Sequence, residues 1–167
     1  LYTKGNYKDG KNDGILKTYH ENGELWIREN FKDGKYDGYY QRYYDNGQLE
    51  RKGNYKNNKH EGLMESYHVN GQLEFKGNFK DGKREGLWEG YNENGQVYTK
   101  SNYKNNKRNG LSRGYYENGQ LRIKGNFKDD KREGLWESFT DKGHLFLKSI
   151  YKDDKREGLL ETYYEDG

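Results

Sequence analysis

Cysteine, proline and alanine are absent from these 167 residues, and so is any long apolar run. The absence of cysteine removes a thiol nucleophile and leaves the redox compartment open. No apolar stretch approaches the roughly 20 residues that a membrane-spanning helix needs. The 31 basic and 28 acidic residues are mixed along the chain, so no basic arm of the kind that binds nucleic acid is present. We therefore expect no nucleic-acid partner.

Apolar residues are scarce as well. They make up 29% of the chain, whereas 35% is charged, and such polarity alone is close to that of disordered proteins. Two features favour a folded protein. Aromatic residues reach 16%, and the sequence follows a strict period that a disordered tail does not need.

A unit of 24 residues recurs along the chain without insertion. With Gly5 counted as position 1, every copy has an aromatic residue at positions 3 and 15 and a glycine at positions 10 and 19. Such constancy between copies is the signature of a repeat architecture. The prediction is one repeat array over residues 1–167, with full copies at 5–28, 29–52, 53–76, 77–100, 101–124 and 125–148 and a partial copy at 149–167.

Each copy predicts two strands joined by a turn. Short aromatic and aliphatic runs, such as residues 120–127 and 134–139, are bounded by Asn-Gly and Asp-Gly, which is typical of hairpins. A helix is disfavoured because each glycine in its interior costs about 1 kcal/mol. A longer connection, Lys-Asp-Gly-Lys-x-x-Gly, would join one hairpin to the next. We predict an all-β fold, an elongated single-layer antiparallel meander of 24-residue β-hairpin repeats.

The Asn-Gly turn allows two registers. A two-residue type I′ turn places position 16 opposite position 21, whereas a type I turn with glycine in a bulge places position 15 there. We favour the bulged register because it gathers the apolar positions 3, 11, 15 and 21 on one face, although the charged position 13 fits that face poorly. The predicted core is then formed by Tyr7, Tyr19, Phe31, Tyr43, Tyr55, Tyr67, Phe79, Tyr91, Tyr103, Tyr115, Phe127 and Phe139.

The opposite face would carry positions 12, 16 and 22, which vary between copies. Large aromatic side chains that the core does not need indicate an interface. The alternative is a structural role, in which these rings cover a twisted sheet or shield glycine backbone. On the interface interpretation, Trp88→Ala weakens a partner and spares the fold, while loss of Tyr91 destabilises it. The predicted partner-binding face comprises Trp26, Tyr40, Tyr44, Trp88, Tyr98, Tyr116, Trp136 and Phe146.

No pattern of catalytic or metal-binding residues stands out. His20 and His68 share position 16 but lie about 19 Å apart by strand spacing, too far to share a metal ion. Residues 9–14 are similar to a calcium loop only superficially, because a lysine stands at the second ligand position and no glutamate closes the loop. We expect no enzyme activity, no metal and no cofactor.

The run Tyr-Lys-Asp-Gly-Lys-x-x-Gly, followed by a hydrophobic strand and Tyr-x-x-Asn-Gly-Gln-Leu, resembles the MORN repeat. It is more similar to the variant form found in bacterial proteins of the YwqK-type antitoxin family, and the resemblance covers the whole chain. Position 12 departs from the eukaryotic Gly-x-Gly pattern, which separates this chain from the lipid and junction roles suggested for eukaryotic MORN proteins. The resemblance implies a binding or neutralising role without enzymatic activity.

These observations predict a module that binds another protein, with an antitoxin or immunity role as its specific form. The alternative is a bacterial surface or secreted protein used in adhesion. A third hypothesis, peripheral membrane binding, is disfavoured by the acidic residues between the lysines. The chain opens in mid-repeat without a polar cap, which predicts a fragment of a longer array or end-to-end self-association. No signal peptide is visible, so a cytoplasmic and a cell-surface location both stay open.

Overall fold

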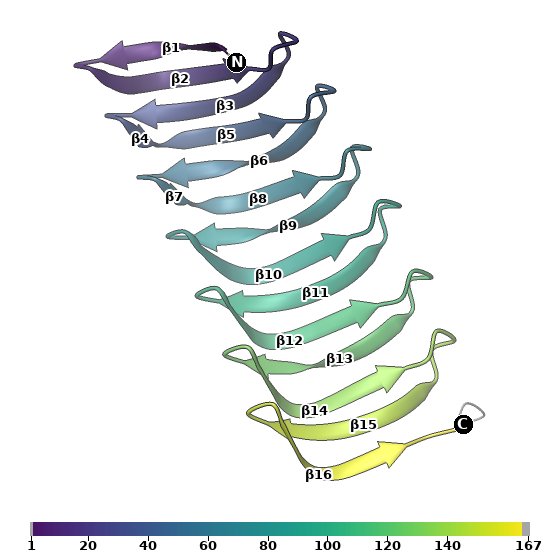
Figure 1. Cartoon of the computed structure of the whole chain (residues 1–167). Helices are drawn as coiled ribbons and strands as arrows, with labels where there is room; N and C mark the ends of the chain where they lie inside the picture. Colours follow the sequence, from purple (N-terminus) through teal and green to yellow (C-terminus); the bar gives the residue numbers. More distant parts are fainter. Residues whose placement is uncertain (1, 165–167) are drawn as a thin grey trace. The chain divides into compact units, whose positions relative to one another are not determined.

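The computed structural model describes residues 2–164, and every regular element in them is a β-strand. Backbone contacts divide the chain into an N-terminal unit, residues 1–83, and a C-terminal unit, residues 84–167. Within each unit the strands follow one another antiparallel in a single layer, and they are bent rather than flat (Figure 1). The predicted all-β antiparallel meander is therefore confirmed, and the described residues contain no helix.

The strands are adjacent in the order in which the chain makes them. The N-terminal unit has the order β1-β2-β3-β5-β6-β8-β9, with the short strands β4 and β7 paired to β3 and β6. The C-terminal unit runs from β10 to β16. The strands of the N-terminal unit are β1 (Tyr2–Lys8), β2 (Lys11–Tyr19), β3 (Leu25–Lys32), β4 (Lys35–Tyr36), β5 (Gly38–Tyr43), β6 (Leu49–Lys56), β7 (Lys59–His60), β8 (Gly62–Tyr67) and β9 (Leu73–Lys80). Those of the C-terminal unit are β10 (Lys83–Tyr91), β11 (Val97–Lys104), β12 (Lys107–Tyr115), β13 (Leu121–Lys128), β14 (Lys131–Phe139), β15 (Leu145–Lys152) and β16 (Lys155–Thr162).

The Asn-Gly turn adopts the bulged register. Tyr91 in β10 lies opposite Val97 in β11, which is position 15 opposite position 21, and the other hairpins repeat this pairing. The amide of Gly95 donates to the carbonyl of the first turn residue (2.8 Å). Its φ of 81° lies in the left-handed region that glycine adopts without strain. The side chain of Asn94 accepts a bond from the amide of Gln96 (2.9 Å). The prediction of this register is confirmed.

The Lys-Asp-Gly-Lys connection is tighter than predicted. Its two central residues both have positive φ, as in Asp81 (51°) and Gly82 (78°). This is a type I′ turn, which joins antiparallel strands through two residues. Where aspartate replaces the glycine, its side chain gains a second role: Oδ1 of Asp130 accepts a bond from the amide of Arg108 (2.9 Å), one repeat earlier. Such bonds tie neighbouring repeats together.

The predicted assignment of the two faces is wrong. Position 15 lies opposite position 21, but position 14 lies opposite position 23, so position 22 is an extra residue in a β-bulge. The extra residue reverses the side-chain alternation beyond it. Positions 1, 3, 12, 14 and 23 therefore share one side of the sheet, which we call the packed face. Positions 2, 11, 13, 15 and 24 share the other, which we call the open face.

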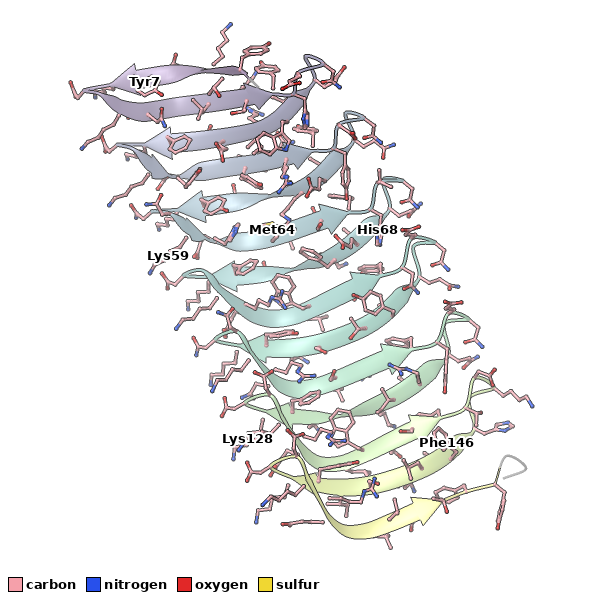
Figure 2. All side chains as sticks on the ribbon, in the orientation of Figure 1. Tyr7, Lys59, Met64, His68, Lys128 and Phe146 are labelled. Carbon is pink, nitrogen blue, oxygen red and sulfur yellow. The ribbon has the colours of Figure 1, made fainter. Side chains whose placement is uncertain are left out.

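The packed face holds the most deeply buried rings. In the C-terminal unit Trp136 lies between Phe127 and Tyr151, with ring centroids 4.9 and 6.4 Å away and nearly perpendicular planes. A Cβ at Gly125 would lie 2.2 Å from the indole. Gly125 therefore makes room for the indole of Trp136. In the N-terminal unit Met64 of β8 (Figure 2) is buried in the same way.

Two tryptophans of the predicted partner-binding face consequently belong to the core. Trp88 is 6% exposed and Trp136 is 7% exposed, so their predicted exposure is wrong. The structural alternative, in which these rings shield glycine backbone, describes position 12 better. In the fifth copy position 12 is the small residue Ser112, and its hydroxyl forms a hydrogen bond with that of Ser101 at position 1 (2.6 Å). Tyr40, also at position 12, is half-buried.

Candidate binding surfaces

The remaining residues of the predicted partner-binding face do not form one surface. Tyr44 and Tyr116, at position 16, are half-buried. Their hydroxyls donate to backbone carbonyls of the next repeat, that of Tyr67 (2.7 Å) and that of Phe139 (2.8 Å). These two tyrosines therefore help to join successive repeats.

The side chains at position 22 lie in the bulge. Trp26 is half-buried, and the guanidinium carbon of Arg42 lies 5.7 Å from its ring centroid. Tyr98 and Phe146 are 45% and 38% exposed. Partner binding by these residues stays a prediction.

The predicted core is divided between the two faces. Tyr7 is exposed, Phe127 is buried, and the others are half-buried. The half-buried rings at position 3, on the packed face, are Phe31, Tyr55, Phe79 and Tyr103. Those at position 15, on the open face, are Tyr19, Tyr43, Tyr67, Tyr91, Tyr115 and Phe139.

Ion pairs on the open face explain the charge at position 13. Lys124, at position 24, lies directly across the strand from Glu137, and their Nζ and Oε2 atoms are 2.8 Å apart. The same ammonium lies 5.4 Å from the ring centroid of Phe139 at position 15. Lys100 and Glu89 form a pair at 2.7 Å within one hairpin, and this bond raises the pKa of Lys100. The rings at position 15 are thus covered by charged side chains, and partly exposed pairs of this kind contribute less than about 1 kcal/mol each.

The open face also carries a row of exposed apolar side chains at position 11. Six of them are between 37% and 60% exposed, and Leu111 is half-buried. Within each unit they come from every second strand, so neighbours are about 10 Å apart. A regular apolar row among charges indicates an interaction surface. We call these residues the position-11 row: Ile15, Tyr39, Leu63, Leu87, Leu111, Leu135 and Leu159.

A polar cluster in the N-terminal unit departs from the repeat. Glu29 occupies position 1, where every other copy has glycine or serine. Burial raises the pKa of Glu29, and its hydrogen bond with Tyr36 partly offsets this. The ring of Tyr55 lies between those of Tyr36 (5.3 Å between centroids) and His60 (4.1 Å), tilted against both, and its hydroxyl lies 2.9 Å from Nε2 of His60. Burial raises the pKa of Tyr55 to about 12 and lowers the pKa of His60. The ionisable carboxyl of Glu29 therefore lies beside the aromatic rings of Tyr36 and Tyr55.

Glu29→Gln should stabilise the protein at neutral pH. The folded state raises the pKa of Glu29, so it binds this proton more tightly than the unfolded chain, and stability falls as pH rises through that window. The amide can still bond Tyr36 but has no charge to bury. The gain should shrink at about pH 3.5, where the carboxyl is mostly protonated in both states. Thermal melts of both proteins at the two pH values measure this, and equal melting at pH 7 would contradict it.

Arginines at position 8 line one edge of the packed face in the C-terminal unit. The guanidinium of Arg108 lies 3.8 Å from the ring centroid of Phe127, and its Nε lies 3.2 Å from Oδ1 of Asp130. Arg132 makes the same two kinds of contact one repeat later. Because each of these guanidinium groups already has a carboxylate and a ring, their positive charge is largely neutralised within the protein.

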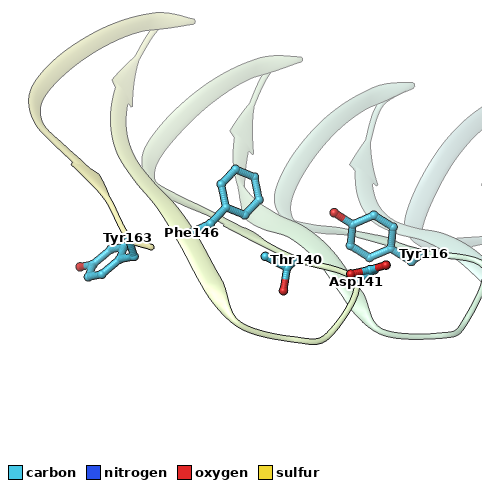
Figure 3. A pocket seen from close by; sticks show the side chains of 5 residues that line it. All are labelled: Tyr116, Thr140, Asp141, Phe146 and Tyr163. Atoms are coloured by element: carbon cyan, nitrogen blue, oxygen red, sulfur yellow. The ribbon is translucent and has the colours of Figure 1, made fainter. Parts of the chain in front are cut away.

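A pocket in the C-terminal unit lies beside the turn that follows β14. Its volume is about 510 Å³, and it is lined by Tyr116, Thr140, Asp141, Phe146 and Tyr163 (Figure 3). Tyr116 and Phe146 belong to the predicted partner-binding face, so the structure brings these two together. Thr140 was not among the predicted site residues; position 16 varies between copies and is also non-aromatic at Asn92.

Metal-ligating side chains do not gather anywhere in residues 2–164: no three of His, Asp or Glu come together as a metal site would require. No helix long and apolar enough to cross a membrane occurs in this part of the chain. The absence of enzyme activity and of cofactors stays a prediction.

Comparison with known families gives one clear result. The pattern of the MORN repeat variant matches residues 12–33, 36–57, 61–81, 84–105 and 108–129, which is more than half of the chain. Successive matches keep the 24-residue phase of the repeat. A comparison with curated proteins found no match. MORN repeats are in general non-catalytic modules that bind proteins or membranes. This chain belongs to the MORN repeat variant family.

Proposed function

We propose that this chain is a non-enzymatic repeat module that binds another protein through the position-11 row. The supporting observation is the exposure of that row, between 37% and 60% for six side chains, although every copy has an apolar residue there. The packed face already has its own large residues, so the sheet does not need the row for its core. Covering the row with a partner would gain about 25 cal/mol per Å² of apolar surface.

The surroundings of the row favour a protein over a lipid surface. Position 2, beside the row, is asparagine in six copies, and position 13 carries glutamates such as Glu89 and Glu137. Because these two carboxylates pair with Lys100 and Lys124, those lysines supply little of the net positive charge that draws basic proteins to anionic headgroups. Apolar anchors with a polar rim are, in contrast, the usual composition of a protein interface. The partner should present apolar side chains at a matching spacing of about 10 Å.

The specific form of this proposal is an antitoxin or immunity role in a bacterium, in which the partner is a toxin. The resemblance to the bacterial variant repeats supports this form. A binding surface needs no chemistry of its own to neutralise a partner, because covering the partner's functional site is sufficient.

The double substitution Leu87→Ser with Leu135→Ser should weaken partner binding about thirtyfold or more, because truncating a buried interface anchor costs at least about 1 kcal/mol. Both leucines are about half exposed in the free protein, so stability should change by less than about 1 kcal/mol. The measurement is calorimetric affinity for a partner first identified by capture on the immobilised wild-type chain.

The matched control is Lys107→Ser with Lys131→Ser, two exposed residues of the same unit outside the row. This control should bind like the wild type. If the leucine variant binds its partner with unchanged affinity while remaining folded, the position-11 row is not the binding surface.

A further inference from the structure

In two copies a tyrosine at position 16 bridges two successive turns. Tyr44 and Tyr116 each reach the carbonyl of a residue 23 positions ahead, with hydrogen bonds of 2.7 and 2.8 Å. In the sixth copy this position is Thr140, whose hydroxyl instead accepts a bond from the amide of His144 in its own turn (3.1 Å). A threonine side chain is too short to reach the equivalent carbonyl, that of Tyr163. The space that the rings of Tyr44 and Tyr116 fill in their own copies is therefore open here.

The open space is the pocket of about 510 Å³ described above. Figure 3 shows the short Thr140 side chain between the rings of Phe146 and Tyr116, with Tyr163 beyond. The volume lies in the range of about 300–1,000 Å³ that is usual for binding sites. Phe146 and Tyr163 are only partly covered, each 38% exposed, so their rings are accessible. Aromatic walls and a backbone acceptor together suit a ring that carries a hydroxyl group.

We propose that this pocket binds a tyrosine side chain of a partner protein. The ring would pack against Phe146 and Tyr163, and the hydroxyl would donate to the Tyr163 carbonyl. The occupant is inferred from Tyr44 and Tyr116, which make this same contact inside the chain. The site shares no residue with the position-11 row, so it goes beyond the proposed function.

The test uses the full chain, labelled with ¹⁵N, and two small probes. One probe is 4-methylphenol, the side-chain analogue of tyrosine, and the other is toluene, which lacks the hydroxyl. We expect 4-methylphenol to shift the amide signals of Thr140, Asp141 and Phe146. Its dissociation constant should be about three- to tenfold lower than that of toluene, which is the usual effect of one hydrogen bond.

Two variants test the location. Thr140→Tyr supplies the missing ring within the chain, so it should abolish 4-methylphenol binding and raise the melting temperature. Thr140→Ser keeps the gap open and should bind the probe like the wild type. A rise in melting temperature also shows that Thr140→Tyr is folded, so that lost binding reports a filled pocket.

Several results would overturn the proposal. These are equal affinity for the two probes, 4-methylphenol binding that survives Thr140→Tyr, and a lowered melting temperature of that variant, which would show that the gap does not fit a ring. A wild-type dimer in equilibrium sedimentation that Thr140→Tyr dissociates would also overturn it, because the occupant would then be a second copy. None of these results depends on the position-11 row, so failure here and failure of the proposed function are distinguishable.

Discussion

Trp136→Ala should lower the free energy of unfolding by about 3–5 kcal/mol. Trp136 is almost fully buried and packs between Phe127 and Tyr151. Its indole N–H donates to the carbonyl of Asn126 (3.2 Å). The substitution removes this bond and leaves a void that the backbone cannot readily close, because ladder hydrogen bonds hold both neighbouring strands in place. Urea denaturation measures the loss.

The matched control for this substitution is Leu135→Ala, one residue earlier in β14. Leu135 points to the open face and is 48% exposed, so its loss should cost less than about 1 kcal/mol. Both substitutions lie in the same strand, so its backbone contributes similarly to both. If Leu135→Ala destabilises the protein more than Trp136→Ala, the packed and open faces are exchanged.

The register of the hairpins was predicted correctly, but the reason given for it was only partly right. Asn-Gly suits both a type I′ turn and a type I turn with glycine in the left-handed region, and the structure has the second, which places Tyr91 opposite Val97. The expected gathering of positions 3, 11, 15 and 21 on one face fails at position 3, which lies on the packed face. The face of Trp88 could not be predicted in the same way. It depends on the extra residue in the bulge, which is Tyr98 in that hairpin. Bulges are often marked by glycine, but here the bulge residue is a large exposed ring that resembles an ordinary strand residue.

A signal for the packed face was nevertheless present in the sequence. In four copies a glycine at position 1 goes with a large residue at position 12, as with Gly125 and Trp136, and Ser101 goes with the small Ser112. The copies that begin with Glu29 and Ser149 depart from this matching. This matching of size across two strands indicates direct contact. Direct contact requires positions 1 and 12 to lie on the same face of the sheet, as they do in the structure.

The pocket at Thr140 was harder to predict. The sequence shows that position 16 varies, but it does not show that a tyrosine there reaches the carbonyl of the next repeat. That contact joins residues 23 positions apart and depends on how successive turns stack. A threonine at position 16 indicates an open site only once the hydrogen bonds of Tyr44 and Tyr116 are known.

The close approach of Gly125 to Trp136 leads to a test by a double-mutant cycle. Gly125→Ser alone should cost about 1–3 kcal/mol, because its Cβ would lie 2.2 Å from the indole and the ring would have to move. In a Trp136→Ser background the same change should cost almost nothing. The double variant recreates the pair of serines seen one repeat earlier, where the hydroxyls of Ser101 and Ser112 lie 2.6 Å apart.

The cycle therefore predicts a coupling energy of at least about 1 kcal/mol in favour of the double variant. Urea denaturation of the four proteins measures this coupling. Gly125 has no positive φ, so backbone strain does not contribute to the cost of serine, and the effect reports the steric contact alone. Additive costs would show that glycine at position 1 has a role other than making room for the ring at position 12. Strong coupling would show that the repeat builds its core from a residue pair matched across strands.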